Sequence, residues 1–253
     1  MKSTNLKHID DTALVFEGGG MRGAFTAGIV ATLIEEGIDF PHVSGISAGS
    51  SNTVNYVSRD AKRAHDTFTT VADSPEFGGF RHWIEGRGMF NVDYLYEEIA
   101  QPDGDAPLDL DTFLANPAEV RIGAFNATRG EEVWFTKDDM RTVEEVGRCV
   151  RASSTLPIIM PTVTIDGDTY VDGALGPNGG IPLDAPATAN SSSSSPVRAT
   201  SLKPRRNRVC APRCAWPSRV FLPLPRPWPV ALSLTTPLAA SFSNWKNKGE
   251  RSS

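Results

Sequence analysis

The fold is decided by residues 42–58, HVSGISAGSSNTVNYVS, where a serine stands between two glycines at the end of an apolar run. The first five residues have the length and composition of a buried strand, and those after Ser47 are predicted to form a helix. Their junction, Gly45-Ile46-Ser47-Ala48-Gly49, is a G-x-S-x-G motif. A serine between a strand and a helix must turn sharply, and flanking glycines let neighbouring backbone approach it. The motif predicts an exposed nucleophile at a helix N-terminus, with an ordinary helix N-cap as the alternative.

A similar unit precedes this stretch. Thr12 to Phe16 is a short apolar run that predicts a buried strand, and Ala24 to Glu36 has apolar residues at helical spacing until Gly37. Two strand–turn–helix units in succession are typical of a parallel α/β sheet.

The turn inside the first unit is rich in glycine and consists of Glu17, Gly18, Gly19, Gly20, Met21, Arg22 and Gly23. Backbone N–H groups in such a turn converge and can hold an anion. Gly18, Gly20 and Gly23 also match the dinucleotide fingerprint G-x-G-x-x-G, and Asp39 follows at a suitable distance for a ribose contact. An oxyanion hole aimed at a serine on another unit is the competing interpretation. A purely structural turn is the third, and the turn alone does not decide among them.

The rest of the first 185 residues predicts further α/β structure. Residues 60–111 read as helices and loops beside the sheet, and residues 142–152 as a helix. Adjacent strands are expected at the ranges 120–126 and 132–136. A hairpin is expected at 162–171, with its turn at Asp166-Gly167. Asp172-Gly173-Ala174 follows the hairpin directly.

Hydrolysis at Ser47 would need a base, and the histidines restrict the choice. They are His8, His42, His65 and His82, so none follows Asp172 as the chain order of an α/β-hydrolase requires. His42 is expected to be a core or strand-end histidine. Either the part that bears the histidine is missing, or a carboxylate held against the hydroxyl acts directly as base. Asp172, at the end of a predicted strand, is the candidate.

Three linked motifs resemble the patatin-like phospholipase family: EGGGMRG after a strand, GISAG, and the later DGA. The stretches AFTAGIVATLIEEGI, RASSTLPIIMP and GDTYVDGALGPNGGIPLDA are similar to the family as well, and the resemblance covers residues 12–185. It implies a parallel-sheet α/β sandwich with a Ser–Asp dyad, in which Ser47 is the nucleophile and Asp172 the general base.

The resemblance also implies the residues around the dyad and the substrate. The turn Gly18–Gly23 would supply the oxyanion donors, and Arg22 would fix that turn. The elbow would be Gly45, Ile46, Ala48 and Gly49, and Gly173 and Ala174 would complete the D-G-A motif. Lipid or phospholipid is the implied substrate, and neither a metal nor a cofactor is expected.

Bulk properties set the expected location. The chain has 253 residues, a net charge of −5 and three cysteines, Cys149, Cys210 and Cys214. No apolar run approaches the ~20 residues of a membrane span, and the polar N-terminus does not resemble a signal peptide. A cytoplasmic protein is expected, with room for peripheral membrane contact and without nucleic-acid binding.

The last 68 residues differ in kind. From Pro186 onward there are 11 Lys or Arg, one acidic residue and 10 of the 19 prolines. We therefore expect a catalytic domain at 1–185, incomplete at its C-terminal end, and a basic tail at 186–253 with little regular structure.

A shifted reading frame would explain the tail. Ser codons of the TCN type, read one base earlier, encode Phe, Leu, Ile or Val, so Ser191–Ser195 would become a buried strand. On that hypothesis the chain lacks a core strand and the helices behind it. A protein that keeps the family's site without its activity is then an alternative function.

Overall fold

The computed structural model describes residues 6–10, 12–86, 88–177, 179–182 and 198–201. All of them belong to the first of two units into which the chain divides, Met1–Arg206 and Asn207–Ser253. The expected strand at Ser191–Ser195 and nearly all of the basic tail lie outside the described residues.

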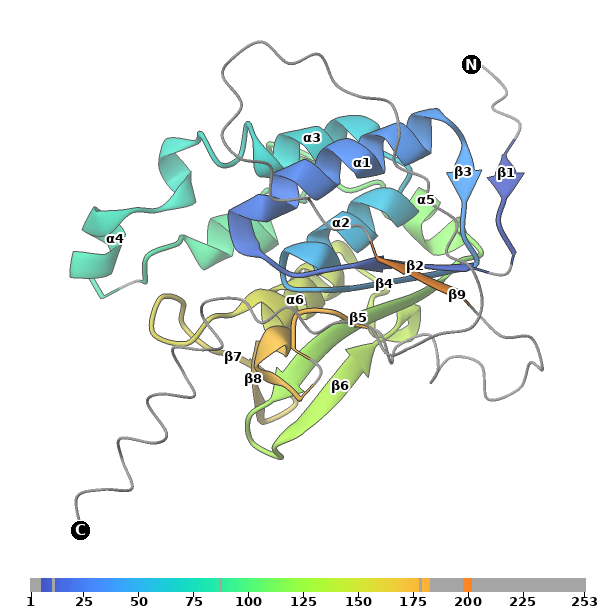
Figure 1. The fold of residues 1–253 in the computed structure, drawn as a ribbon. Coiled ribbons are helices and arrows are strands. Elements are labelled where there is room, and N and C mark those ends of the chain that lie inside the picture. The colour runs from blue at the N-terminus through green and yellow to red at the C-terminus, as the bar shows by residue number, and fades with distance from the viewer. Residues whose placement is uncertain (1–5, 11, 87, 178, 183–197, 202–253) are drawn as a thin grey trace, which may run out of the picture. The chain divides into compact units, whose positions relative to one another are not determined.

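A seven-stranded sheet forms the centre of the described unit (Figure 1). Its strand order is β7-β8-β5-β4-β2-β9. Strands β4 and β8 pair with successive parts of one edge of β5, and β6 pairs with the opposite edge. The strands are β2 (Thr12–Phe16), β4 (His42–Ile46), β5 (Glu119–Asn126), β6 (Glu131–Phe135), β7 (Val163–Ile165), β8 (Asp168–Asp172) and β9 (Arg198–Ser201). The short strands β1 (Lys7–His8) and β3 (Ile38–Asp39) pair separately.

The pairing is mostly parallel, which confirms the α/β class. Strands β9, β2, β4 and β5 run in one direction, as the two strand–turn–helix units predicted. The part of the sheet beyond β5 is different, since β6 and β8 both run antiparallel to β5 and β7 runs antiparallel to β8.

Helices cover the sheet, and α1, α2 and α3 lie on one side of its β2–β4 half (Figure 1). Helix α6 packs against β5, β8 and α2. The helices are α1 (Gly23–Glu35), α2 (Ala48–Val57), α3 (Ala61–Phe68), α4 (Phe80–Ile84), α5 (Leu110–Ala115) and α6 (Val143–Ser154). Single turns are η1 (Gly20–Arg22), η2 (Pro75–Phe77), η4 (Lys137–Asp139) and η5 (Gly173–Leu175), and η3 (Tyr94–Glu98) is a π-helix. None of the described helices is long and apolar enough to cross a bilayer.

Local sequence accounts for several boundaries. Gly37, with φ 66°, ends α1 because a glycine adopts the left-handed conformation without strain. Thr142 begins α6 through a capping box, in which the Thr142 side chain accepts the backbone N–H of Glu145 and the Glu145 side chain accepts the backbone N–H of Thr142. Asp166 and Gly167 both have positive φ, as a two-residue hairpin turn of type I′ requires.

The core lies between these helices and the sheet. Strand β2 is apolar after Thr12, and its four apolar residues are all buried, as expected of a central parallel strand. Tyr56 of α2 is fully buried against Phe16 and Phe40, and its hydroxyl donates to the Ile38 carbonyl at 2.6 Å. The polar end of Tyr56 is therefore satisfied while its ring fills the core.

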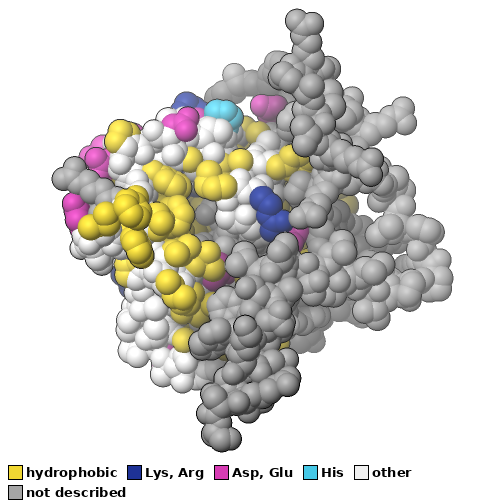
Figure 2. Space-filling model, turned by 60° about the vertical axis from the view of Figure 1, so that its left-hand side comes forward, with side chains coloured by type: hydrophobic (Ala, Val, Ile, Leu, Met, Phe, Trp, Pro, Cys, Tyr) yellow, Lys and Arg dark blue, Asp and Glu magenta, His cyan; other side chains and the backbone are white. Residues whose placement is uncertain are grey.

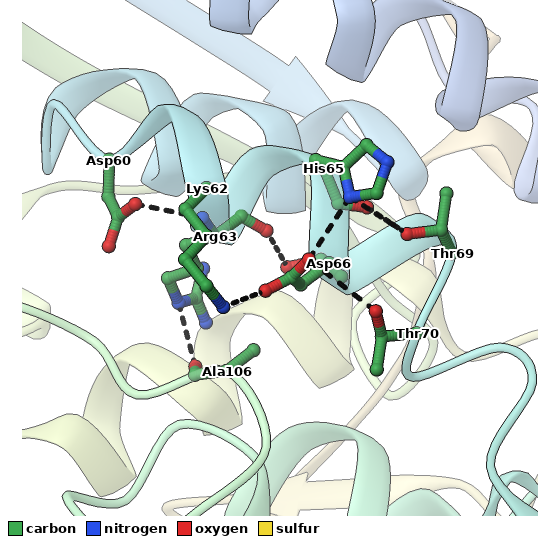
Figure 3. A network of polar contacts seen from close by, with 9 residues as sticks. Asp60, Lys62, Arg63, His65, Asp66, Thr69, Thr70 and Ala106 are labelled. Carbon is green, nitrogen blue, oxygen red and sulfur yellow. Dashed lines mark hydrogen bonds and ion pairs between the residues drawn. The ribbon is translucent and has the colours of Figure 1, made fainter.

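A polar network fixes α3 (Figure 3). Asp60 caps the helix by accepting the Arg63 amide at 2.8 Å. The buried Arg63 side chain donates to the Ala106 carbonyl at 3.0 Å and to Asn55 of α2. Asp66 accepts from Lys62, His65 and Thr70 on the outer side. The network thus joins α3 to α2 and to the loop that carries Ala106.

One strand was not expected from the sequence. Strand β9 lies beyond residue 185, inside the region for which little regular structure was predicted, and it pairs in parallel with β2. These four residues add a strand that the sequence did not indicate, because backbone pairing along β2 needs no apolar pattern in the added strand. The expectation for the rest of the tail stays a prediction.

Candidate active site

Ser47 occupies a strained turn between β4 and α2. Its φ of 56° and ψ of −129° are outside the regions that a residue with a side chain prefers. Such a conformation costs about 1–3 kcal/mol and persists only where the surroundings impose it. The serine is not the exposed residue that the motif predicted, since only 7% of its surface is accessible.

The flanking glycines permit the turn because backbone passes very close to both. A methyl group on Gly45 would lie 2.2 Å from the Gly49 carbonyl oxygen, and one on Gly49 would lie 2.2 Å from the Phe16 carbonyl oxygen. These distances are far inside ordinary contact, so the start of α2 can approach both β4 and β2 only without side chains at these positions.

Strand β5 brings the second half of the site to Ser47. Strand β4 runs parallel to β5 and ends with Ile46 opposite Gly123. Strand β8 runs antiparallel to β5 and ends with Asp172 opposite Ala124, the next residue of β5. The carboxyl ends of β4 and β8 therefore meet at consecutive positions of one strand. Ser47, which follows β4, and Asp172 are brought together although β4 and β8 run in opposite directions.

Asp172 is buried beside the Ser47 hydroxyl. Only 2% of its surface is accessible, and its carboxylate accepts the Ala174 amide at 2.8 Å. Burial raises the pKa of Asp172, while hydrogen bonds from the Ser47 side chain and the Ala174 amide oppose this shift. Gly173 is required next to it, since a methyl group there would lie 2.5 Å from the Gly123 carbonyl oxygen.

The glycine turn lies beside Ser47. A methyl group on Gly18 would stand 3.1 Å from Cβ of Ser47. The amide of Gly18 donates to the Gly180 carbonyl at 2.8 Å, and the amide of Arg22 donates to Gly19 at 3.2 Å. The amide of Gly23 donates to the carbonyl of Gly20.

The expected donor set is therefore smaller than the whole turn, because the amides of Gly18, Arg22 and Gly23 already have acceptors. Within the described part of the chain, no hydrogen bond engages the amides of Gly19, Gly20 or Met21. These three N–H groups can donate hydrogen bonds to a new negative charge. Arg22 folds back over the turn, and its Nε donates to the Gly19 carbonyl at 3.5 Å.

The histidines lie away from this pair. His42 starts β4, at the opposite end of the strand from Ser47, and its Nδ1 is 3.6 Å from Glu119. Burial lowers the pKa of His42, so the neutral ring is favoured. His8 pairs with Asp39 and His65 with Asp66, while His82 lies on α4.

The acidic residue of the dinucleotide alternative is already engaged. Asp39 forms an ion pair with Arg59, and its carboxylate lies 3.0 Å from Nδ1 of His8 on β1. Its carboxylate thus stabilises the junction of β1 and β3 and is not free for a ribose. Among the described residues no three His, Cys, Asp or Glu side chains gather as metal ligands.

Two contacts of α6 were not predicted. The Ser47 amide donates to Oγ of Ser153 at 2.9 Å, and the Asp172 amide donates to the Thr155 carbonyl at 2.7 Å. Both acceptors lie in the stretch RASSTLPIIMP, which resembles the family. The local sequence does not indicate that Ser153 and Thr155 accept hydrogen bonds from amides far away in the chain.

The chain is similar to known proteins over most of its described residues. The family model described as patatin-like phospholipase matches residues 14–186. The uncharacterized protein YjjU of Escherichia coli strain K12 is 26% identical over 165 residues, which are 64% of this chain and 45% of that protein. The crystal structure of VipD from Legionella pneumophila has a TM-score of 0.46 and 14% identity, over 76% of this chain and 49% of VipD. The chain thus spans about half the length of each of these relatives.

Proposed function

The chain belongs to the patatin-like phospholipase family, and on this premise we propose that it cleaves fatty acyl esters of lipids or phospholipids. Ser47 is the proposed nucleophile and Asp172 the general base. The observation that carries the proposal is the meeting of β4 and β8 on β5, which sets a buried carboxylate beside a strained serine. Asp172 offers a base for Ser47 without a histidine, and no histidine follows Asp172 in the chain.

The proposed reaction has two steps. Ser47 Oγ attacks the ester carbonyl carbon while its proton passes to the Asp172 carboxylate, and the oxyanion forms beside the amides of Gly19 and Gly20. Collapse breaks the ester bond, and the protonated Asp172 returns the proton to the leaving alcohol. Water then attacks the acyl-enzyme while its proton passes to Asp172. Collapse breaks the bond between Ser47 Oγ and the acyl carbon, Asp172 returns the proton to Ser47 Oγ, and a fatty acid is released.

The raised pKa of Asp172 suits this role. A carboxylate that accepts a proton from an alcohol is a stronger base when its pKa is higher, and burial raises it here. The same burial excludes water from the serine–carboxylate contact. The helix N-terminus after Ser47 and the amides of the glycine turn favour negative charge on the substrate side.

Variants of the dyad test the proposal in the 253-residue chain. We expect Ser47→Ala to abolish labelling by a fluorophosphonate probe and Asp172→Asn to lower kcat by about 10²–10⁴. Ser44→Ala is the matched control, since Ser44 is a buried serine three residues earlier on β4. Fatty acid release from p-nitrophenyl butyrate and from phosphatidylcholine vesicles is measured. Equal labelling of the parent and Ser47→Ala would refute the nucleophile, and no release by a labelled parent would favour a protein without lipase activity.

Contact with a lipid surface is a second part of the proposal. Large apolar side chains are exposed at Met21, Phe25, Phe80, Trp83, Ile84, Leu156, Ile158 and Leu175. Figure 2 shows hydrophobic side chains gathered on the face of the molecule on the α4 side. The Met89 amide donates to the Ile159 carbonyl at 2.8 Å, so the segment after α4 lies against the loop after α6.

Ile158 is the most unusual member of this face. It is 88% exposed and has φ 82°, a conformation in which a β-branched residue is strained. Met21 and Leu175 belong to the turn and the 3₁₀ turn that adjoin the candidate site. We propose that this face rests on the bilayer from which the substrate comes.

Vesicle flotation tests the face without catalysis. In a Ser47→Ala background, we expect Trp83→Ser and Ile158→Ser to weaken binding to phosphatidylcholine vesicles at least about tenfold. Burying such side chains contributes about 1.5–3 kcal/mol each. Leu6→Ser is the control, because Leu6 is exposed next to β1, away from α4 (Figure 1). Equal flotation of all three variants would refute the face.

A further inference from the structure

The amide of the proposed nucleophile is held by a side chain from a distant helix. Ser47 N–H donates to Oγ of Ser153 at 2.9 Å, and the Ser153 hydroxyl donates to the Gly123 carbonyl at 2.6 Å. Ser153 is fully buried. Its hydroxyl uses both of its functions, accepting from the turn after β4 and donating to β5. It therefore connects the elbow to the strand on which β4 and β8 meet.

The next residues of the same segment hold the proposed base. The Asp172 amide donates to the Thr155 carbonyl at 2.7 Å. Ser153–Thr155, at the end of α6, thus accepts the backbone amides of both Ser47 and Asp172. We call this segment the 153–155 bracket. It joins the two residues through backbone amides, independently of the contact between their side chains.

The bracket acts on the two features that position Ser47. Ser47 has a strained φ of 56°, and its amide is buried beneath the turn. Without Oγ of Ser153, both this amide and the Gly123 carbonyl would lose a buried partner, which the turn can recover only by shifting. A displacement of ~1 Å between reacting groups can cost about 10²-fold in rate. The bond also engages the Ser47 amide. The hydrogen bonds to the oxyanion would therefore come from the amides of the glycine turn.

We infer that Ser153 is a positioning residue, which through the 153–155 bracket sets the Ser47 hydroxyl against the Asp172 carboxylate. The inference rests on the proposed function, because it assigns Ser153 a role in the same reaction. Ser153 does not touch the substrate in this scheme. It holds the backbone on which the nucleophile stands, so its loss lowers the rate of the chemical step and leaves substrate binding unchanged.

Four variants of the 253-residue chain test the inference. Ser153→Ala removes the hydroxyl, Ser153→Thr keeps it, and Ser153→Cys keeps the shape with a weaker donor and acceptor. Ser44→Ala removes a hydroxyl that is equally buried on β4 and that has no hydrogen-bond partner among the described residues. Each variant is assayed with p-nitrophenyl butyrate and a fluorophosphonate probe at a temperature where circular dichroism shows it folded.

For Ser153→Ala we expect kcat and the rate of probe labelling to fall about 10–100-fold, with KM within about twofold. Ser153→Thr should restore most of kcat, Ser153→Cys should lie between, and Ser44→Ala should match the parent. A kcat within twofold of the parent in Ser153→Ala would overturn the inference. If Ser153→Ala does not fold, the same result in Ser153→Cys overturns it.

Hydrogen exchange separates this inference from the proposed function. Peptides that contain Ser47 should exchange faster in Ser153→Ala than in Ser44→Ala, whether or not the parent hydrolyses esters. An inactive, unlabelled parent with this faster exchange would refute the proposed function and support the bracket. Unchanged exchange in an active parent would refute the bracket alone.

Discussion

Replacing Gly49 with alanine should disable the candidate site far more than it destabilises the protein. Gly49 is the second residue of α2, and a methyl group there would lie 2.2 Å from the Phe16 carbonyl oxygen, 2.8 Å from its carbon and 3.0 Å from the Glu17 carbonyl oxygen. All three neighbours are backbone atoms next to the glycine turn. None can rotate away, so the start of α2 has to move.

The size of the movement follows from these distances. Ordinary contact begins at 3.4 Å, so the 2.2 Å approach requires a separation of roughly 1.2 Å between α2 and the end of β2. Overpacking of this kind costs about 1–3 kcal/mol of stability. Ser47 moves with α2 while the glycine turn stays with β2, and an error of about 1 Å can cost ~10²-fold in rate.

The assay compares kcat for p-nitrophenyl butyrate with the thermal midpoint in Gly49→Ala and in a control. Gly104→Ala is the control, since its methyl group would lie 2.4 Å from the Glu98 carbonyl oxygen in a loop that contributes nothing to the site. Both variants should lose similar stability, but only Gly49→Ala should lose about 10²-fold in kcat. A similar kcat in the two variants would refute the argument from backbone spacing.

Further predictions concern single groups. Because burial raises the pKa of Asp172, kcat/KM should fall on acidification at a pH above the ordinary value of 3.8, and Asp172→Asn should abolish this limb of the pH–rate profile. Since the pKa of Asp172 is higher in the folded than in the unfolded state, the free energy of unfolding decreases as the pH rises through these two pKa values. Urea unfolding should therefore show Asp172→Asn to be more stable than the parent at pH 7. Arg63→Met leaves the Ala106 carbonyl without its donor and should lower the free energy of unfolding by about 1–3 kcal/mol in urea titrations; an unchanged midpoint would contradict the network. Burial raises the pKa of Cys149 to about 12, so mass spectrometry should find this thiol unmodified by iodoacetamide at pH 8 in the folded protein. Reading the coding DNA one base earlier across residues 191–195 should yield an apolar run, and a polar product would refute the frameshift proposal.

The sequence predicts the local units of this fold well. Two strand–turn–helix units, the capped helix after Thr142 and the hairpin with its turn at Asp166-Gly167 all appear within a few residues of their expected bounds. Each depends on neighbours in the chain, such as a helical apolar spacing, a capping box or a residue with positive φ. The family resemblance is confirmed over residues 14–186.

The sequence does not predict how the parts of the site meet. Nothing within β8 indicates that it runs antiparallel to β5 or that it ends opposite Ala124, because strand partners are chosen by contacts between distant segments. The hydrogen bond from Ser47 to Ser153 joins residues 106 positions apart. The π-helix at Tyr94–Glu98 has no sequence signature, and β9 pairs through its backbone without an apolar pattern.

The end-to-end arrangement of β4 and β8 on β5 also bears on the time course of folding. A sheet that lacks β8 holds Ser47 without its neighbour, however complete β2 and β4 are. Closing long chain segments costs entropy before any contact repays it, so this docking is slow compared with helix formation. If Asp172 is the base, as proposed, the chain stays chemically inert during synthesis until Asp172 has left the ribosome. During refolding, the moment at which a probe of the proposed nucleophile first labels Ser47 would therefore date the docking of β8 on β5.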